Sequence, residues 1–249
     1  MHTRLRNDAG MSLIEATIIL MILFLLTAVM SPAIGDYVED ARHTKGKEDV
    51  EAIGISISRL QRDIGSCLKV DAALGCTMTN RVEILRSNGP DVVAADLGTT
   101  AAAEFDSTGD ISGSINWDDD QGVGVGDTMD SQFVINGPNY DTPAESFPTG
   151  YTKSGPQAGL GWRGAYLSGP IGTDPWGKVY LVNTLFLVVA SDATDGNGEG
   201  DRRGGWSRDT IAVSAGPNGL FDTPFGGSAN FGTAATGDDL IYVLRGDTR

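Results

Sequence analysis

Residues 6–30 read RNDAGMSLIEATIILMILFLLTAVM, and this stretch decides the fold. The apolar run at 11–30 would form a helix about 30 Å long, which matches the hydrocarbon core of a bilayer. Arg4 and Arg6 precede the run, so we expect the N-terminus to remain in the cytoplasm and the rest of the chain to be exported. A secretory signal peptide has its small-residue cleavage site after the apolar run, whereas Gly10 lies before it.

Glu15 is the residue in this run that membrane anchoring does not explain. Burying an unpaired carboxylate in a bilayer costs about 2.5–3.5 kcal/mol even on insertion scales, so such a group normally has a partner. Glu15 lies near the cytoplasmic end, and the alternative is that its side chain reaches the membrane surface. An ordinary signal anchor is a further alternative for the apolar run.

The segment Gly10-Met11-Ser12-Leu13-Ile14-Glu15-Ala16 follows a short basic leader and begins an apolar helix. In this it resembles the class III signal of type IV pilins and type II secretion pseudopilins. The resemblance implies a leader at 1–10, cleavage by a membrane peptidase between Gly10 and Met11, and methylation of the new N-terminus. It also implies that Glu15 assists assembly by pairing with the N-terminal amine of a neighbouring subunit. Met11 departs from the commonest residue of the family at that position, which is phenylalanine.

An amphipathic pattern extends the helix beyond the membrane. The apolar residues recur at spacings of three and four, and they are Val50, Ile53, Ile57, Leu60, Ile64 and Leu68. We therefore expect one long helix, with 11–34 as transmembrane segment and filament core and 35–79 packed on the following domain. Pro32 lacks an N–H and clashes with the preceding turn, which predicts a kink or local melting at 30–35.

Cys67 and Cys76 are the only cysteines, and they lie where the helical pattern weakens. In an exported domain a disulfide between them would attach the end of the helix to the next loop. Two free buried thiols are the alternative. The spacing excludes a CxxC redox pair, and the lack of further ligands excludes a zinc site.

From residue 80 the helical period disappears, and turn-forming residues separate short apolar runs. β-branched and aromatic content predicts strands in these runs, at 132–135, 179–183, 185–190, 210–214 and 240–244. The expected fold class is α+β, with a long N-terminal α-helix packed on a small antiparallel β-sheet with long loops. The globular domain would span 80–249, and its least regular part, about 91–155, has the character of an insertion.

Two motifs in the C-terminal half resemble those of the major pseudopilin of type II secretion. They are Gly161-Trp162-Arg163-Gly164-Ala165-Tyr166-Leu167 and Asp174-Pro175-Trp176-Gly177-Lys178-Val179-Tyr180. Ser214-Ala215-Gly216-Pro217-Asn218-Gly219 and Gly237-Asp238-Asp239-Leu240-Ile241 are similar to the calcium loop of that family. The resemblance covers the N-terminal helix and the chain from about residue 161, but not 91–155.

The C-terminal loop is the first candidate calcium site. Asp238 and Asp239 are adjacent like charges, which repel unless a cation lies near them, and calcium takes about six to eight oxygen ligands. The resemblance implies that Asn218 holds the position of the first side-chain ligand, as an amide in place of a carboxylate. The lower ligand charge predicts weaker binding, and residues 220–236 enlarge the loop.

Residues 195–201 are a weaker candidate for calcium. Oxygen-bearing side chains occupy every second position, and they are Asp195, Asn197, Glu199 and Asp201. The twelfth position of an EF-hand-like loop, however, holds Trp206 in place of glutamate. The alternative is a solvated, glycine-rich hairpin tip.

Composition and charge exclude several functions. The chain has 18 basic and 33 acidic residues and a formal net charge of −15, so it would repel phosphate backbones and no nucleic acid is expected as a partner. It contains no Gly-x-Ser-x-Gly motif and no phosphate-binding loop ending in Lys-Ser or Lys-Thr. Its two histidines, His2 and His43, leave little room for imidazole catalysis, and we expect no enzyme.

The expected function is that of a structural subunit of a type IV pilus-like filament, most in keeping with the pseudopilus of a type II protein secretion system. The implied partners are copies of itself, minor pseudopilins or pilins, the prepilin peptidase and the inner-membrane assembly platform. The implied location is the inner membrane, single-pass with a cytoplasmic N-terminus, and after assembly a periplasmic or extracellular filament. A surface type IV pilus, for adhesion, motility, DNA uptake or electron transfer, is the alternative that the 91–155 insertion favours. A monomeric, membrane-anchored binding domain is the third class.

Overall fold

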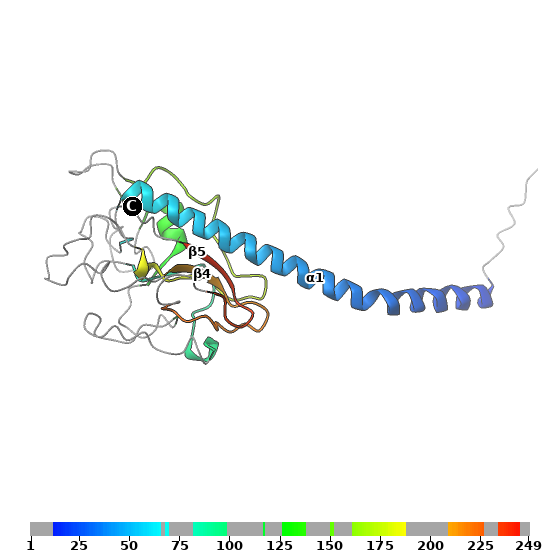
Figure 1. Ribbon diagram of the computed structural model, residues 1–249. Helices are drawn as coiled ribbons and strands as arrows, with labels where there is room; N and C mark the ends of the chain where they lie inside the picture. Colours follow the sequence, from blue (N-terminus) through cyan, green and yellow to red (C-terminus); the bar gives the residue numbers. More distant parts are fainter. Residues whose placement is uncertain are drawn as a thin grey trace, which may run out of the picture. The chain divides into compact units, whose positions relative to one another are not determined.

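The computed structural model describes residues 12–65, 68–69, 82–98, 117, 126–137, 150–151, 161–187, 209–226 and 234–244. By internal contacts the chain divides into two units, at 1–42 and 43–249, and each is described by itself. The elements in chain order are α1 (Leu13–Ile64), β1 (Ile84–Arg86), η1 (Ala94–Asp96), β2 (Gly126–Thr128), η3 (Ser131–Ile135), β3 (Leu181–Val182), η4 (Thr184–Phe186), β4 (Thr210–Ser214) and β5 (Leu240–Leu244) (Figure 1). The fold is α+β, as predicted.

Helix α1 ends earlier than the pattern at 35–79 predicted. Gly65 follows its last residue with a φ of 63°, and its N–H donates to Gln61 O at 2.8 Å. Only glycine adopts this left-handed conformation without steric cost, so it terminates the helix. Leu68 is buried, as the apolar stripe predicted, but it is not helical. The helix is continuous through Pro32, so the alternative of local melting at 30–35 is wrong, because the loss of one N–H does not unwind a helix that continues on both sides.

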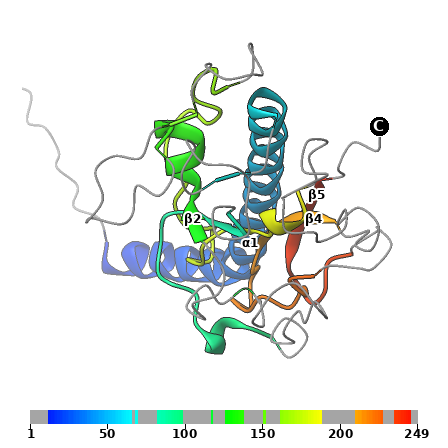
Figure 2. The same ribbon diagram turned by 90° about the vertical axis from the view of Figure 1, so that its left-hand side faces the viewer.

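The sheet is mixed, and the prediction of an antiparallel sheet is wrong at one edge. Its strand order is β2-β1-β3-β4-β5. Strand β2 pairs with β1 in parallel, whereas the β1–β3, β3–β4 and β4–β5 pairs are antiparallel. Figure 2 shows β2 on the side of the sheet away from β4 and β5.

The strand predictions at 210–214 and 240–244 are confirmed in full, and that at 179–183 is confirmed for Leu181–Val182. The prediction at 132–135 is wrong, because Ser131–Ile135 forms a π-helical turn. Gln132 is buried there, and its amide donates to Asp127 Oδ2 and to the carbonyl of Lys69. The prediction of a strand at 185–190 is also wrong at its start, since Thr184–Phe186 is a 3₁₀ turn.

Each face of the sheet covers its own hydrophobic core. The helix-side core contains the α1 stripe together with alternate strand residues, namely Val50, Ile53, Ile57, Leu60, Ile64, Leu85, Val182, Ala212 and Leu244. The opposite core contains the intervening strand residues and three aromatic side chains from loops, namely Ile84, Leu181, Ile211, Val213, Trp117, Phe221 and Phe225. This alternation is the period-two pattern of strands that are buried on both faces.

Two tyrosine hydroxyls fix the second half of α1 to the domain. Tyr180 donates to Asp49 Oδ2 at 2.9 Å, and Tyr166 donates to Asp63 Oδ2 at 3.0 Å. Both tyrosines belong to the two motifs at 161–167 and 174–180, so these motifs hold helix and sheet together. Gly54 contributes by lacking a side chain, because a Cβ there would collide with the ring of Tyr242.

The segment 91–155 is part of the fold where the structure describes it. It provides the edge strand β2 and the η3 turn. Trp117 is fully buried, with its ring against Phe221 and Phe225, and its Nε1–H donates to the carbonyl of Thr223 at 2.6 Å. These parts of 91–155 therefore belong to the sheet and the core, and the interpretation of the segment as an insertion stays a prediction.

Candidate functional site

The first candidate site is the surface of α1 between residues 13 and 38. Every large apolar side chain in this stretch is exposed, from 83% for Leu13 to 44% for Ile19. Residues 18–26 are apolar and exposed without interruption, so they cover all sides of the helix. Within the described residues α1 is the helix that is long and apolar enough to cross a membrane. An apolar surface on every side of a helix requires cover from lipid or from other protein.

Polar side chains within this surface either donate hydrogen bonds to the helix backbone or are exposed without such a bond. Thr17 and Thr27 donate their hydroxyls to the carbonyls of Ile14 and Leu23, each at 2.8 Å, and so need no outside partner. Glu15 is the only ionisable residue between 12 and 35, and it is exposed. Among the described residues its carboxylate has no hydrogen-bond or ion-pair partner. Gly10 and Met11, the predicted cleavage and methylation site, lie outside the described residues.

The second candidate site is the C-terminal loop, where the structure brings Asn218, Asp238 and Asp239 together as predicted. The backbone N–H of Asn218 donates to Asp238 Oδ2 at 2.8 Å. The backbone N–H groups of Asp222 and Thr223 donate to Asp239 Oδ2 at 2.9 and 2.6 Å. Each carboxylate therefore uses one oxygen to close the loop.

Asp222 is the residue of this loop that the sequence analysis missed. Its Oδ2 accepts a hydrogen bond from Asn218 Nδ2 at 2.9 Å. Its carboxylate lies against Gly98 and Gly237, where a Cβ at either glycine would collide with it. The signal that could have found it is the amide at Asn218, which leaves a calcium loop one carboxylate short and directs attention to other acids in 220–236.

The remaining oxygens of the two adjacent aspartates are the strongest sign of a ligand. Asp238 Oδ1 and Asp239 Oδ1 are buried, and among the described residues neither has a hydrogen-bond partner. Asp239 is only 4% exposed, and burial raises its pKa to about 6 against hydrogen bonds from Thr223 and Asp222 that lower it. A buried carboxylate oxygen without a donor costs free energy, and a cation at these atoms would remove that cost.

The donor set fits calcium in chemistry but is not assembled into a compact acid cluster. Carboxylates, an amide and backbone carbonyls are the ligands that calcium takes. Yet no group of three or more His, Cys, Asp or Glu side chains in the described parts of the chain is arranged to hold a metal ion. A bound calcium would therefore need amide or carbonyl oxygens, or a shift of Asp222 towards the other two aspartates.

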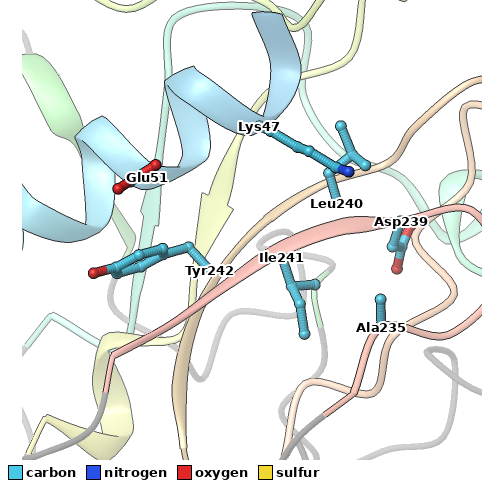
Figure 3. Close-up of a pocket in the computed structure, with 7 residues that line it drawn as sticks. All are labelled: Lys47, Glu51, Ala235, Asp239, Leu240, Ile241 and Tyr242. Carbon is cyan, nitrogen blue, oxygen red and sulfur yellow. The ribbon is translucent and has the colours of Figure 1, made fainter. Parts of the chain in front are cut away.

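A groove of about 570 Å³ runs beside this loop, between α1 and β5. It is lined by Lys47, Glu51, Ala235, Asp239, Leu240, Ile241 and Tyr242 (Figure 3). Asp239 and Ala235 lie at one end of the view and Glu51 and Tyr242 at the other. Asp239 therefore borders this groove, although its side chain is largely buried.

The other predicted site residues lie outside the described residues. They are Cys67 and Cys76, the predicted disulfide, and Asp195, Asn197, Glu199 and Asp201, the weaker calcium candidate.

Comparison of the chain with protein-family models, with curated proteins and with solved structures found no match.

Proposed function

We propose that this chain is a structural subunit of a type IV pilus-like filament, which it enters through residues 11–38. The observation that carries the proposal is an apolar helix surface exposed on all sides, with Glu15 as its single ionisable group. A plain anchor needs the apolar surface but not the carboxylate, which opposes insertion. A subunit that passes from the membrane into a filament core uses both.

The energetics of such a filament follow from the same residues. Packing apolar helices side by side buries surface that is worth about 25 cal/mol per Å² relative to water. An unpaired Glu15 in that core would be strongly destabilising, so assembly proceeds only in the axial register that gives it a positive partner. The resemblance to pilins supplies the partner, the N-terminal amine of a neighbouring subunit at Met11.

Within this class we propose the pseudopilus of a type II protein secretion system. The support comes from the two motifs at 161–167 and 174–180 and from the loop that joins Asn218 to Asp238 and Asp239. Other copies of the chain, minor pseudopilins, the prepilin peptidase and an inner-membrane assembly platform would be its partners. Calcium would stabilise the C-terminal loop through Asp238 Oδ1 and Asp239 Oδ1, which have no hydrogen-bond partner within the described part of the chain.

A surface pilus is the competing assignment. The interpretation of 91–155 as a surface decoration favoured it. Strand β2 and Trp117 come from this segment and belong to the sheet and the core. That integration weakens the reason for preferring a surface pilus.

The experiment combines processing and assembly of the full chain in a host with the matching peptidase and assembly ATPase. Intact mass of the membrane-extracted protein should correspond to a chain that begins at a methylated Met11. Glu15→Ala should insert in the membrane at least as well as the wild type but give few filaments in micrographs. Glu48→Ala is the matched control, since it removes an exposed glutamate from the same helix outside the apolar surface.

Two results would contradict the proposal. A mature chain that begins at Met1, or after residue 30, would exclude pilin-type processing. Normal filament yield from Glu15→Ala would remove the assembly role of the carboxylate.

A further inference from the structure

We propose that the outer edge of β5 binds an extended segment of another polypeptide, which adds a strand to the five-stranded sheet. The groove between α1 and β5 receives those side chains of the segment that face the helix. This inference goes beyond the proposed function, because it rests on the second unit of the chain alone. It needs neither processing at Met11 nor assembly through Glu15.

The direction of the backbone groups in β4 shows which groups of β5 face its partner strand. The N–H of Asn183, directly after β3, donates to Ile211 O at 3.3 Å, and the N–H of Ile211 donates to Asn183 Oδ1. The Ile211 backbone therefore points towards β3. In an antiparallel ladder the backbone groups of successive residues point to opposite sides. Those of Ala212 consequently point to β5, where Ala212 is opposite Tyr242.

The N–H and C=O groups of Ile241 and Val243 point the other way, to the outer edge of the sheet. Among the described residues these groups have no hydrogen-bond partner. Edge strands are commonly protected by a charge, a proline or a bulge. The strand sequence LIYVL contains no charge and no proline, and its register with β4 is unbroken. An unprotected apolar edge of this kind is where an extended chain adds to a sheet.

The groove beside this edge carries a positive and a negative charge. Lys47 and Glu51 line it from α1, and both side chains are exposed. Within the described part of the chain neither forms an ion pair. Figure 3 shows Lys47 near Leu240 and Glu51 near Tyr242. The two charges are therefore arranged along the direction of β5.

The spacing of these charges defines the segment that fits. Lys47 and Glu51 are four helical residues apart, which is about 6 Å along the axis. Residues on one face of a strand are about 7 Å apart, which is a close match. A segment antiparallel to β5 would place a basic residue beside Glu51 and, two residues later, an acidic residue beside Lys47. The residue between them would lie opposite Ile241, on the other face of the sheet.

A second copy of β5 fits this edge less well. Antiparallel pairing of two copies through Ile241 and Val243 would place a two-fold axis at Tyr242. Because each Glu51 lies near its own Tyr242, the axis would bring two glutamates towards each other, and like charges repel. Such a pair also closes on itself, whereas a filament requires a head-to-tail contact.

The test is amide hydrogen exchange, measured by NMR on the full chain in detergent. The probe is the blocked peptide acetyl-Thr-Val-Arg-Val-Glu-Val-Thr-amide. In the free chain the amides of Ile241 and Val243 should exchange at least about tenfold faster than that of Tyr242, which pairs with Ala212. Excess peptide should slow exchange at both positions by about tenfold or more, because their N–H groups then donate to the added strand.

Two altered peptides and two variants make the test specific. N-methylation of the central valine should abolish binding, because it removes the N–H that donates to Ile241 O. Exchanging Arg and Glu in the peptide should weaken binding by about three- to tenfold at low salt. The double variant Lys47→Glu with Glu51→Lys should invert the preference between the two peptides. Glu48→Lys, at an exposed glutamate of α1 outside the groove, is the matched control and should keep the wild-type preference.

Fast exchange in the free chain, protection by the peptide and inversion by the double variant would together support the proposal. Slow exchange of Ile241 and Val243 in the free chain at every concentration would overturn it, because the chain would then cover its own edge. Protection that increases with chain concentration would also overturn it, in favour of a second copy. Fast exchange that the peptide leaves unchanged, or equal binding of both peptides, would contradict the partner described. Processing at Met11 and assembly through Glu15 would stand in each of these cases.

Discussion

The two stretches of α1 treat apolar side chains in opposite ways. Between 13 and 38 every large apolar side chain is exposed, whereas between 43 and 64 the stripe from Val50 to Ile64 is buried against the sheet. The second stretch finds its cover within the same chain, and its charged residues occupy the remaining face. The first stretch has no such division into faces, so lipid or other subunits must cover it.

The largest expected effect is on solubility. Removal of residues 1–42, at the boundary between the two units, should give a chain that is monodisperse without detergent and still shows a cooperative melting transition. The full chain should require detergent, because it carries the exposed apolar surface. Size-exclusion chromatography of both chains measures this, and aggregation of the truncated chain would mean that further apolar surface lies in the second unit.

A pair of isoleucine substitutions compares the two stretches directly. Ile57→Ala should lower the free energy of unfolding by about 2–5 kcal/mol, because Ile57 is fully buried and the substitution leaves a cavity. Ile22→Ala should change it by less than about 0.5 kcal/mol, since the Ile22 side chain is 55% exposed. Urea unfolding in detergent, followed by tryptophan fluorescence, measures both. Similar losses would mean that the first stretch also packs on the domain.

The C-terminal loop should make the second unit pH-dependent in chelator. The pKa of Asp239 is raised to about 6 in the folded state, so the folded chain holds its proton more tightly than the unfolded chain does. Stability from this group is therefore full below about pH 4 and is lost as the pH rises to above 6, with an upper limit of about 3 kcal/mol at about 1.4 kcal/mol per pKa unit. Asp239→Asn should flatten this part of the profile, and an unchanged slope in that variant would assign it to other groups.

The smallest expected effect is that of one hydrogen bond. Tyr180→Phe removes the donor to Asp49 and should lower the free energy of unfolding by about 1–2 kcal/mol, because the bond lies in a largely buried position. Burial and the Asp49 carboxylate also raise the pKa of Tyr180, so the wild type should lose stability above about pH 10 and the variant less so. Tyr37→Phe in the exposed stretch is the control, since Tyr37 is 81% exposed. Equal effects of the two substitutions would remove the anchoring role of Tyr180.

The sequence predicted those parts of the fold whose local pattern and final environment agree. The runs at 210–214 and 240–244 are rich in β-branched and aromatic residues, and they form the antiparallel pair β4–β5 at one edge of the sheet. Strands β1 and β2 were missed because each has three residues, and β2 consists of Gly-Asp-Thr without apolar alternation. They form strands because they pair with other strands that are distant in the sequence. A short window of sequence does not contain these pairing partners.

The failure at 132–135 has a different physical cause. Phe133 and Val134 suggested a strand, but Gln132 is drawn into a buried network. That network runs through the carboxylate of Asp127 and the hydroxyl of Tyr151. Satisfying buried polar groups outweighs strand propensity at this position. In the C-terminal loop the same kind of non-local contact explains why the sequence indicated Asn218, Asp238 and Asp239 but not Asp222, whose place depends on Gly98.

The sheet order has a consequence for the timing of folding. The helix stripe is synthesised before the strands that complete its cover, because β4 and β5 follow it far along the chain. Until β4 and β5 have been synthesised, the nascent chain therefore carries an uncovered apolar stripe directly after the exposed apolar stretch of α1. Such long-range closure is slow and exposes the nascent chain to aggregation, so holdase chaperones should bind the region from 50 to 64 until β5 is in place.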